Sequence, residues 1–171
     1  ILYSHNSLKS FDYLTRLDME IGLVEQFENK TLNVFEIGAG VFNFGALLSL
    51  KVRKLNYVIC DLPEMIEASK ASIEDLNLIG MDIEYFNNHQ FDEYLLSDKN
   101  KKVIFFEPDE IDSIDKLSIN FDLFVNHESF SEMNIDIVNN YLIYVQQYLA
   151  KEGIVFLVNR HSRIQLLDLS K

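Results

Sequence analysis

Hydrophobic residues along the chain follow two patterns, a helical spacing and short runs that are almost continuously apolar. Residues 1–30 show the helical spacing, because their apolar positions recur three and four residues apart. The continuous runs come later and are typical of strands buried on both faces of a parallel sheet. The predicted strands are residues 32–37, 56–61, 103–106, 121–126 and 154–158.

Segments with helical spacing separate the predicted strands. Pro63 favours the first turn of a helix, where its missing N–H is not needed, and Gly153 marks the end of the last helical segment. Strands that alternate with helices predict an α/β fold, a doubly wound and mostly parallel sheet with helices on both faces. The predicted helices are residues 44–51, 63–78 and 135–149, with a short strand at 83–86 and a short helix at 91–96 between them.

The length of 171 residues fits a single domain over residues 1–171, with the helical segment 1–30 in front of a core at 32–160. The chain begins at Ile1 and ends soon after its last apolar run, so we expect a fold truncated at the C-terminus. One cysteine cannot form an intramolecular disulfide. No apolar run reaches the roughly 20 residues of a membrane helix, and no signal peptide opens the chain, so a cytoplasmic protein is expected.

Charge narrows the classes of partner. Lysine and arginine total 15 against 27 acidic residues, which gives a net charge of −12. Phosphate binding needs a concentrated positive field, so this balance argues against nucleic acid and anionic membrane surfaces. It favours a small neutral or cationic ligand, or another protein. The oligomeric state stays open.

The residues after each predicted strand are the candidates for chemistry, because open α/β sheets bind ligands at the carboxyl ends of their strands. Gly38, Ala39 and Gly40 follow the first strand. Two close glycines allow a tight turn and let a ligand approach the backbone, while the next helix offers its N-terminal N–H groups. An ordinary strand-to-helix turn is the alternative interpretation of the same residues.

Two carboxylates flank this turn in the predicted fold. Asp61 ends the second strand, where an acid can accept both hydroxyls of a ribose; capping of the next helix is the alternative. Glu36 lies inside the first strand, where nicotinamide-binding fingerprints normally have an apolar residue. A buried carboxylate costs several kcal/mol unless it is paired, so both acids need a structural or functional reason.

At these residues the chain resembles a known family. Glu36-Ile-Gly-Ala-Gly40 and Asp61-Leu-Pro-Glu64 are similar to the first two motifs of methyltransferases that depend on S-adenosylmethionine (SAM). Residues 121–134 resemble a fourth-strand motif of bacterial sugar O-methyltransferases, and the resemblance covers about residues 32–160. The matching residues are Asp122, Leu123, Asn126, Ser129, Phe130, Glu132 and Met133.

The resemblance implies an enzyme, a SAM-dependent O-methyltransferase that methylates a hydroxyl of a small molecule, a sugar, and releases S-adenosylhomocysteine. A sugar hydroxyl is a poor nucleophile, so a general base within hydrogen-bond reach would help, and the candidates are His127, Glu128 and His161. Histidine is favoured because its ordinary pKa is close to neutrality. The cofactor-binding residues that the resemblance implies are Glu36, Gly38, Ala39, Gly40, Asp61, Leu62, Glu107 and Asn126.

The sequence departs from the family pattern at the glycine-rich turn. Phe42 and Asn43 stand where a third glycine is expected, and we expect Phe42 to narrow the cofactor pocket, since Gly45 comes too late to replace that glycine. Two alternatives follow, an NAD-dependent Rossmann oxidoreductase and a catalytically inactive methyltransferase-like binding module. Ser129 and Glu132 also fit a capping box for the next helix. No cluster has metal-ligand spacing, so no metal is predicted.

Overall fold

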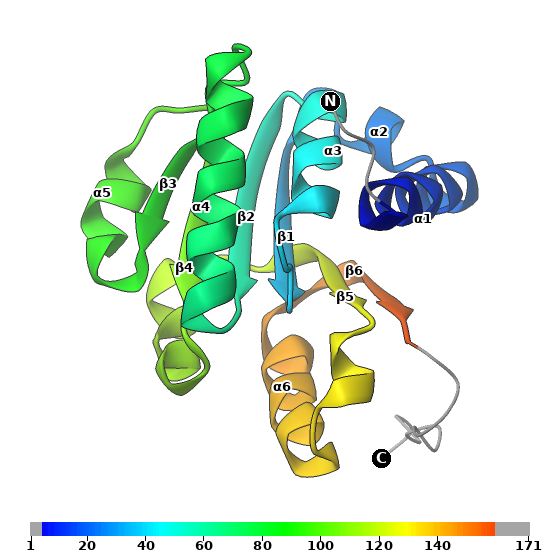
Figure 1. Ribbon diagram of the computed structural model, residues 1–171, viewed down its shortest axis with the longest axis vertical. Helices are drawn as coiled ribbons and strands as arrows, with labels where there is room; N and C mark the ends of the chain where they lie inside the picture. The colour runs from blue at the N-terminus through cyan, green and yellow to red at the C-terminus, as the bar shows by residue number, and fades with distance from the viewer. Residues whose placement is uncertain (1–4, 160–171) are drawn as a thin grey trace.

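The computed structural model describes residues 5–159 (Figure 1). These residues form a six-stranded sheet in the order β3-β4-β2-β1-β5-β6, and every neighbouring pair of strands is parallel. This confirms the predicted doubly wound α/β fold. The strands are β1 (Thr31–Ile37), β2 (Lys54–Cys60), β3 (Glu84–Asn87), β4 (Lys101–Phe106), β5 (Phe121–His127) and β6 (Leu149–Val158).

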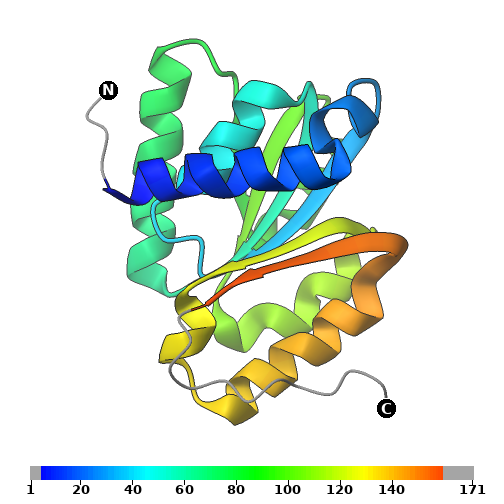
Figure 2. The ribbon, with the colours of Figure 1, turned by 90° about the vertical axis from the view of Figure 1, so that its right-hand side faces the viewer.

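Helices cover both faces of the sheet (Figures 1 and 2). One face packs against α1 (His5–Ile21), α2 (Leu23–Gln26), α3 (Asn43–Lys51) and α4 (Pro63–Leu78). The other face packs against α5 (Phe91–Leu96), the 3₁₀ helix η2 (Pro108–Leu117) and α6 (Ile135–Tyr148). Two short 3₁₀ helices, η1 (Asn88–Gln90) and η3 (Ser129–Glu132), follow β3 and β5.

Strand β1 shows why the predicted strands are continuously apolar. Successive side chains of a strand point to opposite faces. Leu32 and Val34 therefore join the core under α1, α3 and α4, whereas Phe35 and Ile37 join the core against η2 and α6. All four residues are buried, so both faces of the strand contribute to the hydrophobic stability of the fold.

Most predicted elements are confirmed within a few residues, and α4 and α5 have the predicted bounds. The last strand is the exception, because β6 begins at Leu149 and Gly153 lies inside it. The pairing of β5 with β6 shifts register between Phe121 and Leu123, opposite this glycine. A Cβ on Gly153 would come 2.8 Å from the carbonyl oxygen of Phe121, so the close approach of the strands requires a glycine there.

The strand order locates the crevice of the sheet. From β1 the chain passes to β2, then to β3 at the edge of the sheet and back to β4 between β3 and β2, before it crosses to place β5 on the other side of β1. Ligands of open α/β sheets bind at such a switch point, outside the carboxyl ends of the strands. The segments that follow β1, β2 and β5 are therefore the ones that position a site.

Candidate functional site

The turn after β1 has a backbone that requires its glycines. Gly38 and Gly40 have φ angles of 73° and 62°, a region that side chains with a Cβ rarely adopt. The N–H of Gly38 donates a 3.0 Å hydrogen bond to the carbonyl of Cys60 at the end of β2. A Cβ on Gly38 would lie 2.3 Å from Oγ of Ser129, so the turn is pressed directly against η3.

The side chain of Phe42 points into the core, which corrects the expectation that it narrows a cofactor pocket. Phe42 is fully buried, with a φ of 62°, and its ring packs edge-on against Tyr57 with 5.4 Å between centroids. A Cβ on Gly45 would lie 2.1 Å from Cε2 of Phe42. Gly45 therefore makes room for the Phe42 ring inside the hydrophobic core.

Asp61 fixes the glycine turn to the end of β2. Its Oδ2 accepts a 2.9 Å hydrogen bond from the N–H of Gly40, and its Oδ1 accepts a 2.8 Å bond from the N–H of Leu62. Burial raises the pKa of Asp61 above its ordinary value, and the two backbone donors partly oppose that shift. The N-cap of α4 is Leu62, with no side-chain cap, so the alternative in which Asp61 caps the helix is wrong.

Glu36 lies at the centre of a buried group of polar side chains. The residue is 1% exposed, and its Oε2 accepts a 2.6 Å hydrogen bond from the hydroxyl of Tyr57. Its Oε1 lies 3.4 Å from Nδ1 of His127. Sequence reasoning missed Tyr57, because a tyrosine in an apolar strand is typical of the core. Glu36 itself was the signal, because a buried acid on the adjacent strand needs a donor such as a tyrosine hydroxyl.

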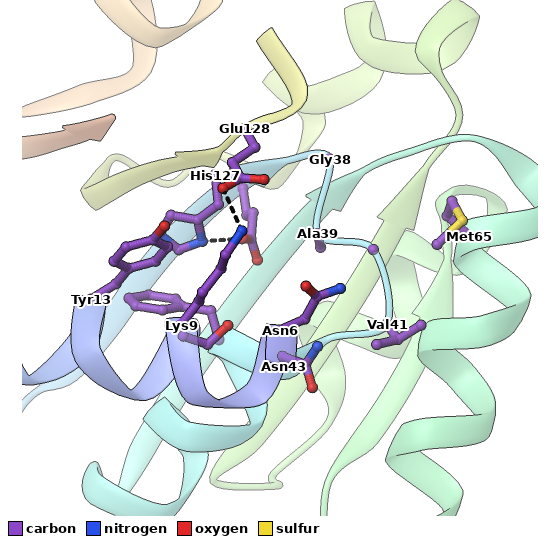
Figure 3. A pocket seen from close by; sticks show the side chains of 14 residues that line it. Asn6, Lys9, Tyr13, Gly38, Ala39, Val41, Asn43, Met65, His127 and Glu128 are labelled. Atoms are coloured by element: carbon purple, nitrogen blue, oxygen red, sulfur yellow. Dashed lines mark hydrogen bonds and ion pairs between the residues drawn. The ribbon is translucent and has the colours of Figure 1, made fainter. Parts of the chain in front are cut away.

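His127 is enclosed by aromatic rings. Its imidazole lies 4.7 Å from the ring of Phe44, 5.0 Å from Tyr13 and 5.6 Å from Phe156, between centroids. Its Nε2 is buried without a hydrogen-bond partner among residues 5–159. Figure 3 shows Tyr13 beside the imidazole of His127. His127 is thus held between a carboxylate and a set of aromatic rings.

An ion pair connects the first helix to the end of β5. Nζ of Lys9 in α1 lies 2.8 Å from Oε1 of Glu128, and the two side chains are 28% and 27% exposed (Figure 3). Glu128 has a φ of 66°, and its N–H donates a 2.6 Å hydrogen bond to the carbonyl of Val158. Lys9 was not predicted, because nothing in its sequence neighbourhood distinguishes it from a solvated lysine on a helix.

Two cavities lie side by side at the carboxyl ends of β1, β2 and β5. The larger, about 640 Å³, extends from the glycine turn and Asp61 to η3 and the start of α6. The smaller, about 210 Å³, lies under α1 and is drawn in Figure 3. We call the two together the cleft. The residues that line both cavities are Gly38, Gly40, Met65, His127 and Glu128.

The structure brings most predicted site residues to this cleft. The predicted residues that line one cavity or the other are Glu36, Gly38, Ala39, Gly40, Asp61, Leu62, His127 and Glu128. Glu107 lines a separate cavity of about 230 Å³ together with His89 and Lys70. His161 lies outside the described residues.

Asn126 lies behind the wall of the cleft, 0% exposed. Its Nδ2 donates a 2.8 Å hydrogen bond to the carbonyl of Ile37, and its Oδ1 accepts a 3.2 Å bond from the N–H of Phe130. The amide therefore joins the ends of β1 and β5. Ser129 contributes to the same junction, because its Oγ also donates to the carbonyl of Ile37, at 3.1 Å.

The alternative of a Ser129–Glu132 capping box is wrong. The N-cap of α6 is Asn134, whose side chain accepts a 2.9 Å hydrogen bond from the N–H of Asp136. Within residues 5–159 no group of three or more histidine, cysteine or acidic side chains is arranged to hold a metal ion. The helices of this part of the chain are all too short or too polar to cross a membrane.

Comparisons with known proteins give a limited result. No family model matches the chain, and no curated protein matches it. Among solved structures, the chain is similar to precorrin 8W decarboxylase of Methanobacterium thermoautotrophicum, with 19% sequence identity and a TM-score of 0.45. The match covers 80% of this chain and 60% of that one, so the chain spans well under the full length of that structure.

These comparisons correct the expected family. The solved structure described above is named as a decarboxylase, and no sugar O-methyltransferase was matched by family model or by curated sequence. The prediction of methyl transfer to a sugar hydroxyl is therefore wrong on these findings, and the NAD-dependent oxidoreductase has no support either. The likeness to the decarboxylase is too distant to assign its reaction to this chain.

Proposed function

We propose that the cleft binds an adenosyl cofactor, S-adenosylmethionine or a molecule like it, and that the chain is an enzyme. The observation that supports this most is the Asp61 carboxylate. Each of its oxygens accepts one backbone N–H, from Gly40 and from Leu62, and the residue lines the larger cavity. An ionised carboxylate has about four acceptor positions, so one on each oxygen is left for the two hydroxyls of a ribose.

The fixed geometry of this carboxylate favours binding. Asp61 is held by the turn that forms the floor of the cavity, so its orientation is set before a ligand enters. The protein therefore loses less conformational freedom when a ligand binds, which improves affinity. The turn is also open to the ligand at Gly40, where the nearest atom to an added Cβ would be Cε of Met65, at 4.0 Å.

The charges of the cleft favour an adenosyl cofactor over a dinucleotide. Four acidic side chains line it, those of Glu36, Asp61, Glu128 and Glu132, against one lysine, Lys9. A pyrophosphate would meet net repulsion there, whereas a sulfonium or an ammonium group would be attracted. The contact of His127 with a buried carboxylate at the edge of the cleft is an arrangement common in active sites, which supports enzyme function.

Titration calorimetry with adenosine and 2′-deoxyadenosine tests the proposal. Removing one hydroxyl leaves one oxygen of Asp61 without its partner, so the deoxynucleoside should bind on the order of tenfold more weakly. Asp61→Ala should weaken adenosine and abolish the difference between the two nucleosides. Asp98→Ala, on an exposed loop, is the matched control. Equal affinity of the unmodified chain for both nucleosides would overturn the assignment of Asp61 to a ribose.

A further inference from the structure

The smaller cavity contains a cation that the nucleoside site does not use. Lys9 is the one lysine or arginine among the described residues that line the cleft, and its side chain is 28% exposed. Figure 3 shows it reaching from α1 across the cavity toward Glu128, with Asn6 and Asn43 on the same side. A volume of about 210 Å³ suits a small charged group and is too small for a nucleoside.

We infer that Lys9 recognises a carboxylate of the bound ligand, and that Glu128 forms an ion pair with the ammonium of Lys9 until the ligand binds. The inference rests on the proposed adenosyl cofactor and specifies it further, because it requires that the ligand end in a carboxylate. S-adenosylmethionine satisfies this requirement, whereas adenosine does not.

Glu128 is suited to act as the internal substitute for a ligand carboxylate. Its oxygen lies 2.8 Å from Nζ of Lys9, at a hydrogen-bond distance expected for an ammonium and a carboxylate. Its backbone is held by the bond to Val158, so an exchange of the side chain's partner does not require the chain to move. A partly exposed ion pair contributes little net stability, and an arriving carboxylate can replace it at small cost.

The remaining lining of the smaller cavity suits the other charge of an amino acid. Glu36 lies at its floor, and an ammonium group placed beside it would gain a buried carboxylate as partner. Asn43 is oriented by the hydroxyl of Ser7, which donates a 3.1 Å hydrogen bond to its Oδ1. A zwitterionic group therefore meets both a cation and an anion within one small cavity.

The test compares SAM with decarboxylated SAM, which differ only in the carboxylate, by calorimetric titration into the full chain. The unmodified chain should bind SAM more tightly. Lys9→Met should weaken SAM on the order of tenfold or more and leave decarboxylated SAM unchanged. Glu128→Gln should tighten SAM about two- to fivefold, because the competitor for Lys9 is gone. Lys30→Met and Glu25→Gln, both exposed and away from the cleft, make the same changes of charge as controls.

The outcomes separate the two proposals. Equal affinity of the unmodified chain for the two ligands, or equal weakening of both by Lys9→Met, would overturn the role of Lys9 and leave the ribose site standing. A Glu128→Gln variant that binds SAM more weakly would overturn the competition between the two carboxylates. If neither ligand binds and adenosine does not bind either, the proposed function fails, and the inference about Lys9 fails with it.

Discussion

The hydroxyl of Tyr57 donates a 2.6 Å hydrogen bond to Oε2 of Glu36, and both residues are buried. The two residues lie on the adjacent strands β2 and β1. Burial and the neighbouring carboxylate raise the pKa of Tyr57 well above its ordinary value, so the phenol stays protonated and remains a donor. Glu36 can therefore remain at the floor of the cleft because β2 supplies a permanent partner.

Removing this hydroxyl should destabilise the fold. Tyr57→Phe leaves a buried carboxylate with one donor fewer, and we expect the free energy of unfolding to fall by about 1–3 kcal/mol. Tyr85→Phe is the matched control, since that hydroxyl donates a 2.8 Å bond to Glu74 at the surface, and its loss should cost less than about 0.5 kcal/mol. Urea denaturation measures both. Equal losses in the two variants would contradict the importance of the buried bond.

Two glycines with similar backbone angles should respond differently to alanine. Gly22 has a φ of 64° with no atom within 4 Å of an added Cβ, so Gly22→Ala should cost only the backbone strain, about 1 kcal/mol. Gly38→Ala adds a clash with Ser129, and overpacking costs about 1–3 kcal/mol more. Thermal denaturation of the two variants gives the comparison. A Gly38→Ala chain as stable as Gly22→Ala would show that η3 can move away freely.

The contact between Phe42 and Gly45 should reverse the effect of Gly45→Ala on stability, from destabilising to stabilising, when Phe42 is removed in a double-mutant cycle. Gly45→Ala alone forces the Phe42 ring to move and should destabilise by about 1–3 kcal/mol. In a Phe42→Ala background the clash is gone, and alanine is favoured over glycine within helix α3 by about 1 kcal/mol. The same substitution should then stabilise that destabilised variant. Denaturant unfolding of the four chains measures the coupling, and additive effects would disprove it.

Ligand affinity should depend on pH through Asp61. Burial raises the pKa of this carboxyl, so it takes up a proton at a higher pH than an ordinary aspartate. Protonation removes an acceptor for the ribose, and adenosine affinity should be complete above this raised pKa and fall as the pH drops through it. Titrations from about pH 7 to about pH 4 cover the range. The affinity of 2′-deoxyadenosine should change less, and parallel pH profiles would contradict the prediction.

The same shift has the opposite consequence for stability without ligand. A folded-state pKa that is raised means that the folded chain holds the proton more tightly than the unfolded chain. The contribution of Asp61 to stability is therefore complete below the unfolded pKa and is lost as the pH rises through the folded one. Ionised Asp61, the form that the proposed ribose contact requires, therefore lowers the stability of the fold.

Local sequence was enough to predict the strands of the sheet and the residues that form half of the cleft. Continuous apolar runs identified the strands, and Pro63 located the start of α4, because these signals depend on neighbours in the chain. The other half of the cleft is formed by α1, whose Lys9 and Tyr13 reach the end of β5 only through tertiary packing. The orientation of the Phe42 side chain could not be predicted either, since a left-handed backbone at a phenylalanine has no signature in sequence.

The motifs that suggested a family describe backbone geometry first. Gly38 is required because Ser129 lies against the turn, and Asp61 is required because it accepts two backbone N–H groups. Such requirements follow from the fold and recur in proteins of different function. The motifs therefore located the cleft correctly, although the reaction inferred from them was wrong.

Helix α1 is joined to the rest of the chain mainly through α3 and α2, with no hydrogen bonds into the sheet comparable to those between strands. Proteins open locally as well as globally, and a peripheral helix can detach at a lower free energy than the strands beneath it. Detachment of α1 would remove Lys9 and Tyr13 from the cleft and leave Asp61 and the glycine turn intact. If the two proposals hold, discrimination between ligands and the ability to bind a nucleoside belong to parts of the molecule that can be lost one after the other.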